Sequence, residues 1–77
     1  MAEMCVALPG RVVWIGERSA TSIPARIDVG SHEAPADLAM VPQAEVGDYV
    51  IAHSGFAIRL VETTTAEQVR AQLGITD

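Results

Sequence analysis

The chain has 77 residues, of which 49% are apolar, 19% charged and 4% aromatic, and its formal net charge is −5. This length corresponds to one small domain that buries about 60–65% of its unfolded surface, which excludes a large catalytic cleft between domains. The sequence has no lysine and its five arginines are scattered. We therefore expect neither nucleic-acid binding nor attraction to an anionic membrane surface.

The longest apolar run, Met4–Leu8, is far shorter than the roughly 20 residues that span a bilayer. No basic region precedes it, so we expect no signal peptide and no membrane anchor. The single cysteine, Cys5, excludes an intramolecular disulfide. A free thiol fits a reducing compartment, and this predicts a cytoplasmic protein.

The first half of the sequence predicts an extended segment followed by two strands. Residues 1–9 are expected to be extended, because Pro9 disfavours helix at the residue before it. Residues 10–15 are rich in β-branched and aromatic side chains, which is typical of a strand. Residues 22–29 alternate between apolar and polar side chains, which indicates a half-buried strand. Pro24 has no N–H to donate, so it is expected at the start of that strand or on an exposed edge.

A turn at Gly30-Ser31 is followed by a weaker strand over residues 32–41, which Pro35 interrupts. Two strands on either side of such a turn predict a hairpin. Residues 42–47 are expected to form a loop.

Two further strands are predicted in the second half, over residues 49–53 and 56–61, and Ser54-Gly55 separates them. The second of these alternates and places three apolar side chains on one side: Phe56, Ile58 and Leu60.

A short helix is predicted over residues 64–74. Thr64 and Glu67 have the spacing of a capping box, in which each side chain satisfies a backbone N–H near the helix start. Gly74 is a natural stop. One apolar stripe is expected to dock on the sheet, formed by Ala66, Val69 and Leu73.

These elements predict a mainly β, single-domain protein covering residues 1–77. Five short strands in hairpin order would close into a small OB-like antiparallel β-barrel over residues 10–62, followed by the C-terminal helix. The competing architecture is an open sheet covered by the helix.

Cys5 and His53 are the residues most suited to chemistry. A thiolate is a soft ligand, and a histidine at a strand end can ligate a metal or relay a proton. The alternatives are a cysteine buried as a small hydrophobe and a histidine satisfied by a backbone carbonyl. His32 and three aspartates (Asp28, Asp37 and Asp48) are expected to serve turns and solvation. One Cys and one His cannot fill a tetrahedral zinc site, so a metal held there would need ligands from elsewhere.

Two motifs resemble the HypC/HupF family of hydrogenase assembly chaperones. Met4-Cys5-Val6-Ala7-Leu8-Pro9-Gly10-Arg11-Val12 is similar to the N-terminal signature M-C-x-x-x-P-G-x-V. Val46-Gly47-Asp48-Tyr49-Val50-Ile51-Ala52-His53-Ser54-Gly55-Phe56-Ala57 resembles the second block, V-G-D-[YW]-V-[IL]-V-H-x-G-F-A. The segment Ala25–Gly30 is similar to the family's A-x-V-D-x-G strand. The resemblance extends from Met4 to the terminal helix.

The resemblance implies a small cytoplasmic protein with an OB-like barrel that acts in [NiFe]-hydrogenase maturation and is not an enzyme. It implies a transient Fe(CN)₂CO cargo held by Cys5 and His53, with no permanently bound cofactor. The implied partners are a HypD-type iron–sulfur protein and the hydrogenase large-subunit precursor. The residues implied to bind partners are Met4, Cys5, Val6, Pro9, Gly10, His53, Gly55 and Phe56.

The start of the chain departs from the family pattern. In the family the cysteine usually follows the initiator Met directly, whereas here Met1-Ala2-Glu3 precede Met4-Cys5. Translation from Met4 would expose Cys5 at the N-terminus, and translation from Met1 would leave it internal. Two other interpretations of the sequence are an OB-type protein-interaction module without a metal role and a thiol enzyme with a Cys5–His53 pair.

Overall fold

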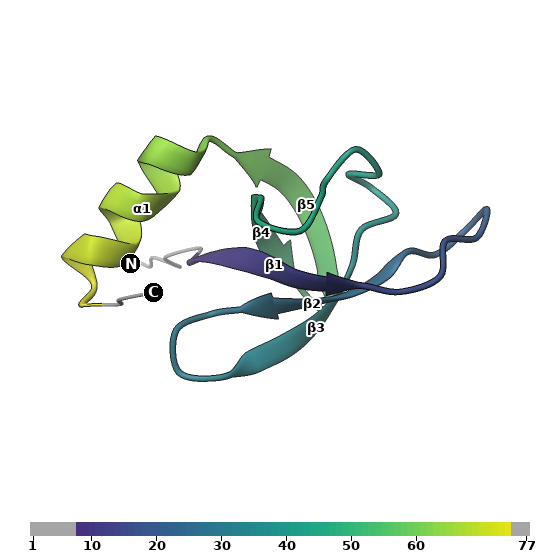
Figure 1. Cartoon of the computed structure of the whole chain (residues 1–77), viewed down its shortest axis with the longest axis horizontal. Helices are drawn as coiled ribbons and strands as arrows, with labels where there is room; N and C mark the ends of the chain where they lie inside the picture. The colour runs from purple at the N-terminus through teal and green to yellow at the C-terminus, as the bar shows by residue number, and fades with distance from the viewer. Residues whose placement is uncertain (1–7, 75–77) are drawn as a thin grey trace.

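Five strands and one helix follow each other along residues 8–74, the part of the chain that the computed structural model describes (Figure 1). They are β1 (Pro9–Ile15), β2 (Pro24–Asp28), β3 (Glu33–Asp37), β4 (Tyr49–His53), β5 (Phe56–Val61) and α1 (Thr63–Gln72). The strands form a closed barrel in the order β1-β2-β3-β5-β4, with β1 also paired to β4. This is a five-stranded barrel of the OB type, so the predicted fold class is confirmed and the open-sheet alternative is wrong.

The β2–β3 hairpin is confirmed, although both strands are shorter than predicted. Pro24 opens β2, where its missing N–H breaks no ladder bond. β3 ends at Asp37, because the Asp37 carboxylate accepts hydrogen bonds from the backbone N–H groups of Ile23 and Ala39. Those bonds turn the chain out of the strand. Leu38, just after this turn, is fully buried and still contributes to the core.

The barrel interior is filled by small and branched apolar side chains. The alternation predicted for the second strand is confirmed, because Ile23, Ala25 and Ile27 are buried while Arg26 is exposed. The core cluster consists of Val12, Ile23, Ala25, Ile27, Ala36, Leu38, Val41, Ala44, Val50 and Ala57. Its many alanines fit the narrow lumen of a barrel this small.

The prediction that Phe56, Ile58 and Leu60 share one side of β5 is wrong, because Leu60 is partly buried and packs against the core. Ala57 is fully buried, while Phe56 and Ile58 are 48% and 45% exposed. The register between β4 and β5 shifts at Ile51/Ala52, so Ile58 is an extra residue in the ladder. Phe56 and Ile58 therefore lie on the outer surface of the barrel.

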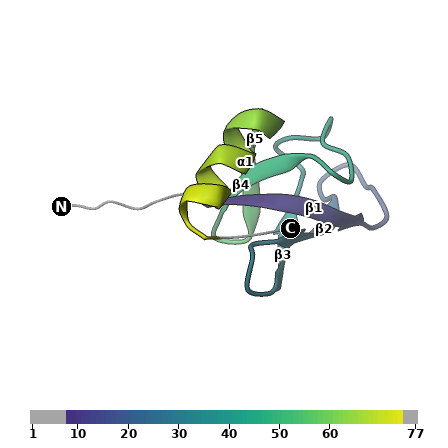
Figure 2. The same cartoon turned by 60° about the vertical axis from the view of Figure 1, so that its left-hand side comes forward.

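α1 lies at the end of the barrel where β1 begins, as both views show (Figures 1 and 2). The predicted capping box is wrong: the N-cap is Glu62, and its side chain makes no capping hydrogen bond. Leu73 is 52% exposed, so the predicted apolar stripe is also wrong in part. The buried helix residues are Ala66 and Arg70. Gly74, with φ +79°, follows the helix as predicted.

The pairing between β3 and β5 is the shortest strand pairing in the described barrel. These strands run parallel and pair where Asp37 lies opposite Phe56, so the barrel is not antiparallel throughout and the predicted hairpin order is wrong between β3 and β4. The Asp37 N–H donates to the Gly55 carbonyl, so this side of β3 faces β5. Pro35, two residues earlier on the same side, has no N–H to offer. Within residues 8–74 no helix is long and apolar enough to cross a membrane.

Candidate functional site

The start of β1 is packed against two neighbouring strands. Pro9 and Gly10 are buried and pair with Ile51 and Val50 of β4. A Cβ atom on Gly10 would lie 2.7 Å from the Cδ1 atom of Ile27 in β2, closer than two carbon atoms can approach. Glycine is therefore required here by close packing. The Pro-Gly pair of the first motif fixes where the N-terminal segment meets the barrel.

Arg70 of α1 is 1% exposed and contacts the start of β1 from the helix. Its Nη1 donates to the Pro9 carbonyl at 2.8 Å and to the Asp28 carbonyl at 3.0 Å. Its Nη2 lies 3.7 Å from Oδ2 of Asp28, and its Cζ lies 5.4 Å from the centre of the Tyr49 ring. One guanidinium thus joins α1 to β1, β2 and β4.

Sequence reasoning missed this role for Arg70. A weak signal was present, because Arg70 follows Ala66 by four residues and so shares the helix face that docks on the barrel. A charged residue at such a position suggests a buried partner rather than solvent. Asp28, at the end of a predicted strand, was the available partner.

His53 is the last residue of β4 and is exposed. The turn that follows has positive φ angles at Ser54 (56°) and Gly55 (84°), as a tight two-residue hairpin turn requires. Phe56, the first residue of β5, pairs with His53 across this hairpin. Within residues 8–74 no hydrogen bond to the His53 imidazole is found.

The predicted site residues are only partly placed. Met4, Cys5 and Val6 lie outside the described residues, so the expected meeting of Cys5 with His53 stays a prediction. Pro9 and His53 come from neighbouring strands, and Pro9 lies opposite Ile51, two residues before His53. The described chain therefore begins beside the end of β4 that carries the histidine. Gly55 and Phe56 flank that same end, and both are exposed.

The remaining polar candidates serve local structure, as expected. The Asp37 carboxylate accepts from two backbone N–H groups and from the Ser22 hydroxyl, and the backbone bond from Ile23 does most to lower the pKa of Asp37 below its ordinary value. Asp48 accepts from the Glu45 N–H in a turn. Among residues 8–74, no group of three or more His, Cys, Asp or Glu could hold a metal ion. A metal at His53 would need ligands from elsewhere.

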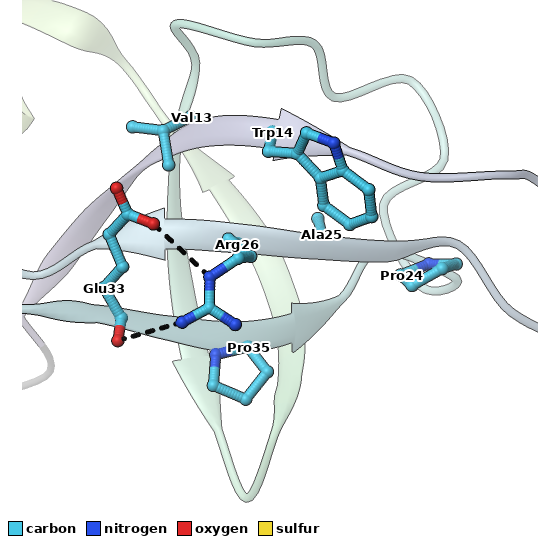
Figure 3. A pocket seen from close by; sticks show the side chains of 7 residues that line it. All are labelled: Val13, Trp14, Pro24, Ala25, Arg26, Glu33 and Pro35. Atoms are coloured by element: carbon cyan, nitrogen blue, oxygen red, sulfur yellow. Dashed lines mark hydrogen bonds and ion pairs between the residues drawn. The ribbon is translucent and has the colours of Figure 1, made fainter.

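A groove that the sequence did not predict lies on the outside of β1, β2 and β3 (Figure 3). It has a volume of about 590 Å³ and is lined by Val13, Trp14, Pro24, Ala25, Arg26, Glu33 and Pro35. The Trp14 ring lies over β2 and packs against Gly16, where a Cβ would meet it at 2.5 Å. Arg26 forms an ion pair with Glu33, with Nε 3.3 Å from Oε1. A smaller adjoining hollow of about 180 Å³ includes Gly55.

A family model, the HupF/HypC family, matches residues 4–73. The chain belongs to the HupF/HypC family. The match spans both Cys5 and His53, and it confirms the resemblance carried by the two motifs.

Several curated relatives match this chain over two thirds or more of their own length. Hydrogenase maturation factor HypC of Synechocystis sp. is 39% identical over 71 residues, covering 91% of this chain and 93% of the relative. The protein of the same name in Cupriavidus necator is 37% identical over 65 residues, covering 84% of this chain and 68% of the relative. That of Azotobacter chroococcum is 32% identical over 71 residues, covering 91% and 79%.

Proposed function

We propose that the protein is a hydrogenase maturation chaperone. In this role it carries an Fe(CN)₂CO unit together with a HypD-type iron–sulfur protein and delivers it to the large-subunit precursor of a [NiFe]-hydrogenase. The observation that carries the proposal is the family match across residues 4–73, together with relatives that are named hydrogenase maturation factors. The single free thiol favours a reducing compartment, so the proposed location is the cytoplasm.

The geometry of the described barrel supports a shared site for Cys5 and His53. Paired residues of neighbouring strands lie about 5 Å apart, and two residues along a strand span about 7 Å. His53 is thus close to the start of β1, because Pro9 lies opposite Ile51. Three residues lie between Cys5 and Pro9, so four Cα-to-Cα steps join them and reach at most about 14 Å. A chain of this length can bridge the distance from Pro9 to His53.

The two side chains suit such a cargo. Iron that carries cyanide and carbon monoxide is a soft centre, for which a thiolate is a fitting ligand. A neutral imidazole at His53 can serve as a second ligand or donate a hydrogen bond to a cyanide nitrogen. Two protein ligands hold the iron through few bonds, so the cysteines of an acceptor protein can displace them.

Loading should depend on pH through the thiol. Cys5 must lose its proton to solvent before its sulfur can bind the iron. Loading should therefore weaken as the pH falls well below the free-cysteine value of about 8.5, less any shift that the metal induces.

The direct test is infrared spectroscopy of the protein purified anaerobically with its partners from a host that makes [NiFe]-hydrogenase. Wild-type protein should show cyanide and carbon monoxide stretching bands, and Cys5→Ala should lose them. His53→Gln should weaken or shift the bands. His32→Gln is the matched control, because His32 is an exposed histidine in the β2–β3 loop. Full hydrogenase maturation with Cys5→Ala as the sole copy would refute the proposal.

The groove beside Trp14 favours a second candidate, an OB-type interaction module without a metal role. A half-exposed tryptophan in an apolar groove is a common anchor for a protein partner. On this alternative, Trp14→Ala abolishes partner binding and Cys5→Ala has no effect. On the chaperone proposal, Cys5→Ala is the more damaging change. The mass of the intact native protein would show in addition whether Cys5 is N-terminal.

A further inference from the structure

Three arginines and two carboxylates meet at the outer face of β1, β2 and β3. Arg11 lies opposite Asp28 across β1 and β2, and Glu33 lies opposite Asp28 across β2 and β3. Arg26 is two residues before Asp28 on β2, so its side chain is on the same face. Arg26 forms an ion pair with Glu33. The Asp28 carboxylate lies 3.7 Å from Nη2 of Arg70, which contacts it from α1. Both carboxylates are therefore engaged by arginines other than Arg11.

Arg11 has a buried nitrogen without a hydrogen-bond partner. Among residues 8–74 no acceptor contacts its Nε, which is shielded from solvent, although the residue as a whole is partly exposed. A buried N–H without an acceptor is costly and rare in native proteins. A carboxylate from another molecule would neutralise this partly desolvated charge, and it matches a planar guanidinium through two parallel N–H···O bonds. The arginine therefore favours an acidic partner group.

The apolar groove described above lies next to Arg11 on the same face. Trp14 lies opposite Arg26, whose side chain is on the outer face, so Trp14 also points outward. Trp14 is three positions from Arg11, which places their two Cα atoms at most about 10 Å apart. Its side chain is half-exposed, and Figure 3 shows the ring over β2. A large apolar ring and an arginine thus lie within one short stretch of surface.

The length of the groove fits a short extended segment. The groove has a volume of about 590 Å³, and the adjoining hollow of about 180 Å³ continues it to Gly55. Pro24 and Pro35 line both, so the two form one surface along β2 and β3. From Asp28 to Pro24 the strand rises by roughly 13 Å, the length of about four extended residues. Pro35 has no N–H to donate, so a segment lying here binds through its side chains rather than as an added strand.

We propose that this groove binds a short extended segment of a partner protein, with an acidic side chain on Arg11 and an apolar side chain against Trp14. The acid goes to Arg11 because the other two arginines of the face are already in ion pairs. The separation of Arg11 from Trp14 predicts that the two anchoring side chains are about two or three positions apart. The far end of the segment would lie beside Gly55, in the turn that follows His53. The inference goes beyond the proposed function and does not rest on the iron cargo.

The probe is a library of random heptapeptides displayed on phage and selected against the cargo-free protein. Enriched sequences should carry Asp or Glu about two or three positions from a leucine, isoleucine or proline. The most enriched peptide, prepared synthetically, should shift the indole N–H resonance of Trp14, which is the single tryptophan. Changing its acidic residue to the corresponding amide should weaken its binding to the wild-type protein about tenfold.

Two variants separate the charge of the site from its apolar anchor, and isothermal titration calorimetry measures both. Arg11→Gln should weaken the acidic peptide about tenfold, whereas the amide peptide should bind this variant and wild type about equally. Trp14→Ala should weaken the acidic peptide about thirtyfold, because it truncates the aromatic anchor. Arg59→Gln is the matched control: it removes the same charge from an exposed arginine of β5 and should bind as wild type does.

If Arg11→Gln does not fold, Arg11→Lys replaces it, and it should weaken binding by a smaller factor because lysine lacks the guanidinium fork. Enriched peptides that lack an acidic residue, or that bind Arg11→Gln as tightly as wild type, would overturn the proposal. So would a selection that enriches no sequence above the Trp14→Ala protein. Displacement of the peptide by acetate at a similar concentration would assign Arg11 to free small carboxylates instead of a protein segment.

Discussion

Gly10→Ala is the most informative substitution at the start of β1. The new Cβ would lie 2.7 Å from Cδ1 of Ile27 and 3.1 Å from its Cβ. The Ile27 side chain is 2% exposed and belongs to the core cluster, so it cannot swing into solvent. The substitution therefore forces β1 away from β2 or Ile27 out of its rotamer.

The size of the effect follows from two opposing contributions. An additional methyl group in a packed core destabilises by about 1–3 kcal/mol. Replacing glycine by alanine also restricts the unfolded chain, which stabilises by about 0.4–1 kcal/mol. The net loss in the free energy of unfolding is about 1–2 kcal/mol. In a domain of this size that lowers Tm by about 4–16 °C.

A double-mutant cycle with Ile27→Val isolates the contact. Valine lacks the Cδ1 atom that the new methyl group would strike, and Ile27→Val alone should cost about 0.5–1.5 kcal/mol. In the double variant the closest contact is removed and those at 3.1 and 3.2 Å remain, so we expect a favourable coupling of about 1 kcal/mol between the two sites. Urea unfolding followed by the fluorescence of Trp14, the single tryptophan, measures all four proteins.

Additive effects of the two substitutions would refute this reasoning, as would a Gly10→Ala protein as stable as wild type. Either result would mean that the Pro-Gly pair is not held by the packing of Gly10 on Ile27. The glycine of the first motif would then need another explanation, such as direct contact of its backbone with a partner.

Three further outcomes follow from the described contacts. Hydrogen bonds lower the pKa of Asp37, so its ionised form stabilises the fold above about pH 4, and the free energy of unfolding should fall as the pH drops below that value. Asp37→Asn should be less stable at pH 7, and its free energy of unfolding, measured by urea titration, should change less between pH 4 and lower pH. Glu62→Ser should raise the free energy of unfolding by about 0.5–1 kcal/mol, because serine supplies the missing N-cap hydrogen bond, whereas Thr64→Ala should change it by less than about 0.5 kcal/mol. Thermal unfolding followed by circular dichroism measures both, and a loss of about 1 kcal/mol in Thr64→Ala would contradict this assignment of the N-cap. A double-mutant cycle on Arg26 and Glu33, which are 46% and 54% exposed, should give a coupling of about 0.2–1 kcal/mol that fades in high salt, and a larger, salt-independent value would contradict a surface pair.

The architecture could be predicted from the sequence because the local signals agree with one another. The alternation from Ile23 to Ile27 specifies which face of β2 is buried, and Ser54-Gly55 specifies the turn between β4 and β5. The apolar run that ends before Ser54-Gly55 predicts His53 at a strand end, and β4 does end at His53. These features depend on neighbours in sequence, which periodicity and turn chemistry describe well.

Features that depend on distant contacts could not be predicted in this way. The spacing of Ala66 and Arg70 places Arg70 on the docking face of the helix, but it does not identify the distant Pro9 carbonyl as an acceptor. The Thr64–Glu67 spacing matched a capping box, but the helix begins one residue earlier, at Thr63, so Thr64 lies inside its first turn. The register shift between β4 and β5 lets both Ala57 and Leu60 face the core while Phe56 and Ile58 lie outside, and sequence alternation does not encode this shift.

Pro35 has a consequence for how the protein behaves at high concentration. An unpaired edge of a β-strand can form backbone hydrogen bonds with a strand of another chain, and such pairing is the first step toward fibrils. The margin of β3 that faces β5 is short, and Pro35 removes a donor from it. A β-strand of another chain that paired there would have one backbone carbonyl without a hydrogen-bond donor opposite it. Pro35 thus reduces, in one residue, the capacity of this edge to add a further β-strand and begin aggregation.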